Sequence, residues 1–228
     1  MDRGRSVCNE REAPLEIDNY IHPLGGRLLI DNCIYPLGPS LIVGREWPLK
    51  WYWDQLKCYD HPISNGLRAV YLQDHWKDEH KSVWNSLWQL CESILHFYGI
   101  HQTELSVNIT TFEKGKGSWW HKDISRTDNH CTVNIPIVYH FNDLIEFSSI
   151  DSNLIPRKYK DGTDPVFAKE AELKSVGTVG YVTPALVNTK MIHRSLSHGP
   201  ERTLLRIILQ GSSYDDALTH ILQRRPEG

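Results

Sequence analysis

The sequence predicts a mainly β fold, a double-sheet jelly roll (double-stranded β-helix) core with helices packed on one side. A long helical pattern ends near residue 99, and after it short β-branched segments alternate with Gly- and Pro-containing turns. The chain has 228 residues, 40% apolar and 23% charged, which suits one globular domain. We therefore expect a single domain over 1–228, with helical and strand support in 1–100 and the jelly-roll core in 101–212.

Charge and segment composition argue against several classes of function. The net charge of −3 gives no reason to expect a nucleic-acid partner, and no apolar run approaches membrane-spanning length. The first residues are polar and contain no hydrophobic signal core. Five cysteines, an odd number without CxxC spacing, are typical of reduced thiols. We expect a cytoplasmic protein without a membrane partner, and its oligomeric state stays open.

The elements follow in order along the chain. His80–Tyr98 is expected to form a helix, because apolar residues recur every three or four positions and Gly99 supplies a C-terminal cap. Alternating or β-branched patterns predict strands, with an edge or a bulge at Pro136. The expected strands are Leu105–Phe112, Thr132–Phe141, Ala171–Lys174, Thr178–Thr183, Thr189–Leu196 and Arg202–Leu209. The polar stretch 151–165 suggests a loop or lid, and Tyr214–Leu222 a closing helix.

The chemistry is predicted from a His-Lys-Asp triplet at 121–123. Residues two apart on a strand share a face, so His121 and Asp123 can reach one metal ion together. Two His and one carboxylate on one face of an iron form the facial triad of non-haem Fe(II) oxygenases. The triplet alone is weak, because the chain has 12 His. His193, on a later expected strand, is the candidate third ligand, and the alternative is a histidine packed in the core.

Iron of this kind takes two further electrons from a co-substrate such as 2-oxoglutarate, whose distal carboxylate needs a buried cation. Arginine suits it, because the guanidinium binds a carboxylate through two hydrogen bonds and stays charged. Arg202 lies nine residues after His193, at the start of the next expected strand. Arg206, counted from His198, offers a competing cation.

Two segments resemble the Fe(II)/2-oxoglutarate-dependent oxygenases. Phe112, Gly115 and the triplet at 121–123 stand at the spacing usual in that superfamily, and HRSLSHGPERTL (193–204) resembles the distal histidine and arginine segment of its isopenicillin N synthase-like and plant-type branch. Two departures are the absence of the frequent Tyr at 112 and of Ser two residues after Arg202.

The resemblance implies a set of ligands and a reaction. His121, Asp123 and His193 would hold Fe(II), Arg202 would anchor 2-oxoglutarate, and Asn134 or Thr132 would contact its iron-side carboxylate. Dioxygen would complete the reaction, the hydroxylation, desaturation or cyclisation of an unactivated C–H. The substrate would be a small molecule, an amino acid or a secondary-metabolite intermediate.

Three residues beside the metal pair or the distal histidine are candidate substrate contacts, with surface or packing roles as alternatives: Trp120, Arg126 and Arg194. Two other functions stay open. One is an Fe(II) oxygenase that does not use 2-oxoglutarate. The other is a non-catalytic jelly-roll module that binds a ligand, since a fold does not determine a function.

Overall fold

The computed structural model describes the jelly-roll part of the chain and the elements around it. The described residues are 33–37, 59–60, 67–71, 81–101, 104–123, 130–140, 143–148, 154–156, 166–168, 175–180, 183–199 and 201–224. Within them, none of the helices has the length and apolar character needed to cross a membrane.

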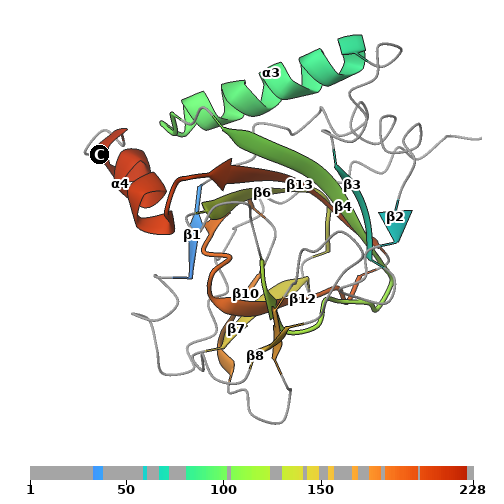
Figure 1. Ribbon diagram of the computed structural model, residues 1–228. Helices are drawn as coiled ribbons and strands as arrows, with labels where there is room; N and C mark the ends of the chain where they lie inside the picture. Colours follow the sequence, from blue (N-terminus) through green and yellow to red (C-terminus); the bar gives the residue numbers. More distant parts are fainter. Residues whose placement is uncertain are drawn as a thin grey trace, which may run out of the picture.

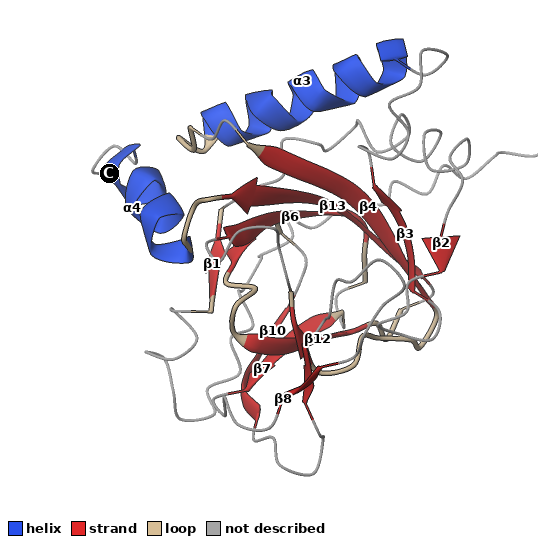
Figure 2. Cartoon of the chain, in the orientation of Figure 1, coloured by secondary structure: helices blue, strands red, loops and turns tan. Residues whose placement is uncertain are grey.

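The described strands form two antiparallel sheets (Figures 1 and 2). The seven-stranded sheet has the order β1 (Ile34–Pro36), β11 (Ala185–Val187), β6 (His130–Val138), β13 (Glu201–Gln210), β4 (Leu105–Glu113), β3 (Leu67–Tyr71) and β2 (Tyr59–Asp60). The six-stranded sheet has the order β10 (Ser175–Gly180), β7 (Leu144–Ser148), β12 (Ile192–Leu196), β5 (His121–Lys122), β9 (Val166–Ala168) and β8 (Leu154–Pro156).

The path of the chain between the sheets is that of a double-stranded β-helix. From β4 to β7 successive strands alternate between the two sheets, β7 pairs with β10, and from β10 to β13 the strands alternate again. The predicted jelly-roll core is therefore confirmed. This winding places strands that are far apart in sequence beside one another, and β5 pairs with β12 in this way.

Both helices pack on the seven-stranded sheet, as Figure 1 shows for α3 (Lys81–Phe97) above it and α4 (Tyr214–Arg224) at its end. Strand alternation explains this, since Leu205, Ile207 and Leu209 of β13 join the cluster that contains the apolar residues of both helices. Leu204 precedes Leu205 and points to the opposite face of β13, where it packs with Phe147 of the six-stranded sheet. The even-numbered side chains of β13 therefore face the interior of the roll.

The helix and several strands lie where the sequence predicts them. Helix α3 ends at Phe97, two residues before Gly99, which adopts φ 79°, and the Ile100 N–H donates to Leu95 O at 2.8 Å. Pro136 lies at a bulge rather than at an edge, because Thr203 pairs with Val138 while the next residue of β13 pairs with Pro136. A proline without an N–H is tolerated there inside the central strand β6.

Several short strands of the two sheets were not predicted, among them β7, β9 and β11. Strands β7 and β11 have five and three residues, and neither shows an extended alternating pattern. The expected strand at 171–174 lies outside the described residues. Of the expected loop at 151–165, the structure describes a three-residue strand, β8.

Candidate metal centre

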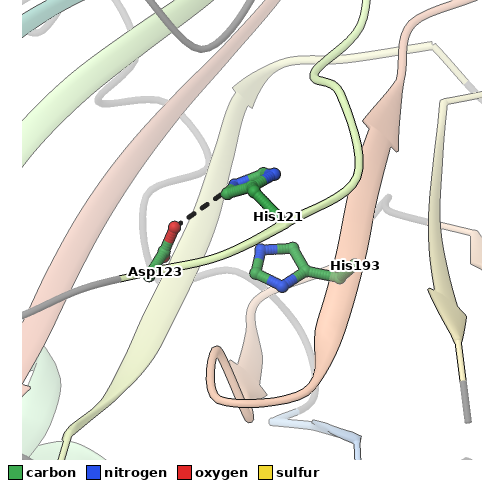
Figure 3. Close-up of side chains that lie close together, drawn as sticks. All are labelled: His121, Asp123 and His193. Atoms are coloured by element: carbon green, nitrogen blue, oxygen red, sulfur yellow. Dashed lines mark ion pairs between the residues drawn. The ribbon is translucent and has the colours of Figure 1, made fainter. Parts of the chain in front are cut away.

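The two candidate histidine ligands face each other across a pair of strands. His121 of β5 is the register partner of His193 of β12, and their ring centroids are 4.5 Å apart. Residues directly opposite in an antiparallel pair have neighbouring side chains on the same face. Asp123 follows His121 by two residues and returns to that face, as Figure 3 shows. Three side chains from two distant segments therefore meet inside the roll.

The ligand atoms of His121, Asp123 and His193 all lie within 4.8 Å of one another. His121 Nδ1 is 2.7 Å from the carbonyl oxygen of Trp119, and His193 Nδ1 is 2.8 Å from that of Met191. Because a carbonyl oxygen only accepts, each Nδ1 carries the proton. With Nδ1 as the donor, Nε2 is the ring atom that faces the metal site, in the orientation that a second hydrogen bond usually imposes on metal-binding histidines.

The same geometry makes the carboxylate a fitting third ligand. Asp123 Oδ1 lies 3.3 Å from His121 Nε2, a contact that needs a proton or a cation between the two acceptor atoms (Figure 3). Its second oxygen, Oδ2, forms an ion pair with Arg206 Nη2. The two oxygens are thus divided, one toward the imidazoles and the other toward a guanidinium.

The charges of the cluster are those that metal binding requires. Burial alone raises the pKa of Asp123, but Arg206, His121 and His193 outweigh it and hold that pKa well below its usual value. Burial, and then the neighbouring His121, lower the pKa of His193 to about 4. At neutral pH the site therefore presents an ionised carboxylate and a neutral imidazole, both competent ligands before any ion arrives.

The backbone of Asp123 is held from both sides. Its N–H donates to Thr189 O at 3.1 Å, and its carbonyl oxygen lies 3.1 Å from Nε2 of the buried His130. Because His130 begins β6 and Thr189 precedes β12, both sheets fix the position of the carboxylate. No spacing in the sequence predicts this contact between His130 and the backbone of Asp123.

Arg202 is a fully buried cation on the inner face of the same strand as Arg206. Its Nη1 donates to Leu144 O at 3.3 Å, and its guanidinium carbon lies 5.4 Å from the centre of the Phe112 ring, its register partner on β4. The two arginines therefore have different surroundings. Arg206 is engaged with the metal-binding carboxylate, whereas Arg202 lies four residues earlier, near the start of β13.

Thr132 and Asn134, predicted to contact the co-substrate, are both buried on the inner face of β6. Asn134 is the register partner of Arg206, and Thr132 that of Ile208. Among the described residues neither Thr132 Oγ1 nor Asn134 Oδ1 has a hydrogen-bond partner. Two further buried polar residues, Asn108 and Thr110 of β4, lie on the same inner face and were missed by the sequence analysis.

The structure places two of the expected substrate contacts away from the metal cluster. Arg194 alternates with His193 on β12, so it lies on the outer face, where its Nε donates to Glu146 at 2.7 Å. Its guanidinium carbon also lies 4.6 Å from the centre of the Trp120 ring. Trp120 and Arg194 thus pack together outside the roll. Arg126 lies outside the described residues.

Comparison with known proteins gives matches among solved structures only. No protein-family model and no curated protein matches the chain. The non-haem α-ketoglutarate-dependent carbocyclase SnoK from nogalamycin biosynthesis is similar at a TM-score of 0.49 and 10% identity, over 77% of each chain. HygX from Streptomyces hygroscopicus, with nickel and 2-oxoglutarate bound, is similar at a TM-score of 0.45 and 12% identity, over 82% of this chain and 94% of HygX.

A Pseudomonas putida prolyl-4-hydroxylase is similar at a TM-score of 0.43 and 13% identity, over 79% of this chain and 93% of the hydroxylase. Hazelnut vicilin is similar as well, at a TM-score of 0.33 and 6% identity, over 66% of this chain and 30% of vicilin. At TM-scores below 0.5 these likenesses do not decide function, which therefore has to be argued from the side chains of this protein.

Proposed function

We propose that this protein is a non-haem Fe(II)- and 2-oxoglutarate-dependent oxygenase that acts on an unactivated C–H bond of a small molecule. The observation that supports the proposal best is the convergence of His121, Asp123 and His193, each held in its metal-binding form by its own hydrogen bonds and neighbours. Two imidazoles and one carboxylate leave other positions of a bound iron open, which is the arrangement that non-haem oxygenases need.

His121 Nε2, Asp123 Oδ1 and His193 Nε2 would hold the iron. Bound there with 2-oxoglutarate, iron supplies the activation of dioxygen that C–H oxidation requires. The protein's share is orientation and exclusion of water. Phe147, fully buried beside the His193 ring with centroids 6.0 Å apart, shields that side of the cluster.

We assign Arg202, rather than Arg206, to the distal carboxylate of 2-oxoglutarate. A guanidinium with no exposed surface is suited to binding a carboxylate, and it stays charged when buried. Arg206 already neutralises Asp123, so its role is at the metal. The two arginines are four residues apart on β13, about 13 Å between Cα atoms. A five-carbon diacid can therefore lie between a metal ion held near Arg206 and the guanidinium of Arg202.

The proposal extends to the type of reaction, the substrate and the place where the enzyme works. Hydroxylation, desaturation and cyclisation all need the same metal ligands, so any of the three fits. We further propose that residues 1–228 act as one domain, that the enzyme works in the cytoplasm and that its substrate is an amino acid or a secondary-metabolite intermediate.

Anaerobic absorption spectroscopy tests the assignment without knowledge of the substrate. Fe(II) and 2-oxoglutarate together should produce a weak visible band in the wild-type protein, and His193→Ala should abolish it. His198→Ala is the matched control and should retain the band, because His198 is an exposed residue whose described contact is through its backbone N–H to Asp143. Loss of the band in His198→Ala with retention in His193→Ala would overturn the ligand assignment.

Product analysis separates the rival functions. Exposure to oxygen with Fe(II), ascorbate and 2-oxoglutarate should release succinate. Oxygen uptake without succinate would instead indicate an Fe(II) oxygenase that does not use 2-oxoglutarate. If the protein released no succinate, consumed no oxygen and gave no visible band, the remaining function would be that of a jelly-roll module that binds a ligand. Arg202→Gln should raise the 2-oxoglutarate concentration needed by roughly 10- to 100-fold, since a charge-assisted bond is lost.

A further inference from the structure

Four polar side chains line the inner face of the seven-stranded sheet and are shielded from solvent. Asn108 and Thr110 come from β4, and Thr132 and Asn134 from β6, the two neighbours of β13. Their exposed fractions are 0%, 3%, 0% and 5%. In the described part of the chain, no hydrogen bond reaches either amide atom of Asn108, Oδ1 of Asn134, or the hydroxyl of Thr110 or Thr132.

Such a cluster does not arise from packing alone. Folded proteins pair nearly all of their buried polar atoms, because an unpaired one has lost its water without compensation. Apolar side chains of the same shape fill other positions of this inner face, such as Leu204 between Thr110 and Pro136. Retained polar atoms here therefore indicate a polar ligand that binds between the sheets.

The register places Asn108 and Asn134 on either side of Arg206, the residue that contacts Asp123. Asn108 and Asn134 are the partners of Arg206 on its two sides, so the three residues form one row across β4, β13 and β6. Arg206 in turn contacts the metal-binding carboxylate of Asp123. Strands lie about 4.8 Å apart, so the two amide-bearing residues stand about 10 Å apart across the row.

The unpaired atoms also define the chemistry of the ligand. The Oδ1 atoms of Asn108 and Asn134 only accept hydrogen bonds, so they need N–H or O–H donors. At neutral pH 2-oxoglutarate has two carboxylates and a ketone, and therefore no donor at all. The co-substrate can pair with the threonine hydroxyls and with the unpaired Nδ2 of Asn108, but it cannot pair with these two oxygens.

We propose that Asn108 and Asn134 bind the primary substrate through its own donors, and that the substrate is a small molecule bearing hydroxyl, amine or amide N–H groups. This inference rests on the function proposed above only in naming the ligand a substrate. A purely hydrocarbon or purely anionic substrate would leave both oxygens unpaired. The row beside Arg206 holds the donor-bearing part of the substrate next to the metal.

A binding experiment with Mn(II) in place of iron tests the proposal without turnover. Mn(II) and 2-oxoglutarate are added to the protein, and the paramagnetic relaxation of probe protons is measured by NMR. The probes are 1,3-propanediol and its dimethyl ether, which share a carbon chain but differ in donors. We expect the diol to be relaxed about tenfold more strongly, the difference that one or two net hydrogen bonds supply. Equal relaxation of the two probes would overturn the proposal.

Substitutions tie the binding to these residues. Asn108→Leu and Asn134→Leu should each reduce diol relaxation to the level of the ether, and the isosteric Thr110→Val is a milder second variant on the same face. Thr111→Val is the matched control, because Thr111 faces the other side of β4 and its hydroxyl pairs with that of Thr203 at 2.9 Å. Unchanged diol relaxation in both Asn variants would refute the assignment.

Thermal unfolding of the metal-free protein supplies a second readout. Removing an unpaired buried amide should raise Tm by about 2–4 °C in Asn108→Leu, whereas Thr111→Val should lower it by a similar amount. A fall in Tm for Asn108→Leu would mean that the amide is paired in the unliganded protein, and would overturn the proposal. If the wild-type protein gave no electron paramagnetic resonance signal of bound Mn(II), that result would instead count against the proposed oxygenase. Failure of the proposed function and failure of the substrate inference are therefore distinguishable.

Discussion

The buried imidazole of His193 should make the metal-free protein sensitive to mild acid. Its pKa is lowered from 6.5 to about 4 in the folded protein, because burial and the adjacent His121 disfavour the charged form. Between these values the unfolded chain binds a proton that the folded chain does not. Stability is therefore fully present above pH 6.5 and is lost as the pH falls toward 4.

The size of the effect follows from the two pKa values. At 1.36 kcal/mol per pKa unit, the lowering corresponds to about 3 kcal/mol at pH 4, of which about 2 kcal/mol is lost by pH 5. Asp123 acts in the same direction but in a separate window. Its lowered pKa stabilises the folded protein above the usual carboxyl pKa near 4, and that contribution is lost at lower pH.

Urea unfolding followed by tryptophan fluorescence, in EDTA, measures the difference. The free energy of unfolding should fall between pH 7 and pH 5 by about 2 kcal/mol more in the wild-type protein than in His193→Gln, which has no imidazole to protonate. His198→Gln should follow the wild type, because that residue is exposed. If the curves of wild type and His193→Gln run parallel over this range, the imidazole is not held neutral by burial and the electrostatic argument fails.

Three further predictions test the surroundings of the cluster. Arg206→Met should destabilise the metal-free protein by about 2 kcal/mol, because it leaves the part-buried carboxylate of Asp123 without its cation. In thermal unfolding, a divalent ion should restore much of the lost stability. Gly117→Ala should impair folding and Co(II) binding, since an added Cβ would lie 2.2 Å from Ser195 O on the strand of His193, whereas Gly180→Ala, with open space around it, should be tolerated in both assays. Arg194→Ala should change stability by less than about 1 kcal/mol and leave Co(II) affinity unchanged, because its ion pair with Glu146 lies on the outer face; weaker Co(II) binding would place Arg194 at the metal after all.

The parts of the fold that could be predicted are those with a local signal. Helix α3 has an apolar stripe and a glycine at its end, and β4, β6 and β13 are long enough for alternation to show. Strands β7 and β11 are too short for that signal, and their pairing with distant strands decides their conformation. Tertiary contacts, rather than local preference, form such strands.

The residues of the candidate site also fall into those that the sequence could predict and those that only the fold brings together. Side-chain type and spacing were enough to single out His121, Asp123 and His193, and strand pairing then brings them together. Trp120 and Arg194 were chosen for their closeness in sequence to a ligand, but a direct neighbour on a strand faces the opposite side. The polar residue Asn108 was missed because only the register of β4 against β13 places it beside Arg206.

The division of labour between the two sheets explains why the site needs the whole roll. The short strand β5 and strand β12 of the six-stranded sheet carry the two imidazoles, and Asp123 directly follows β5. The seven-stranded sheet contributes the residues that tune and surround them, with Arg206 on Asp123 Oδ2 and His130 on its backbone. Neither sheet alone fixes both the charge and the orientation of the carboxylate. A change that loosens the contact between the sheets should therefore weaken metal binding before it unwinds either sheet, because Arg206 and His130 hold Asp123 from the opposite sheet.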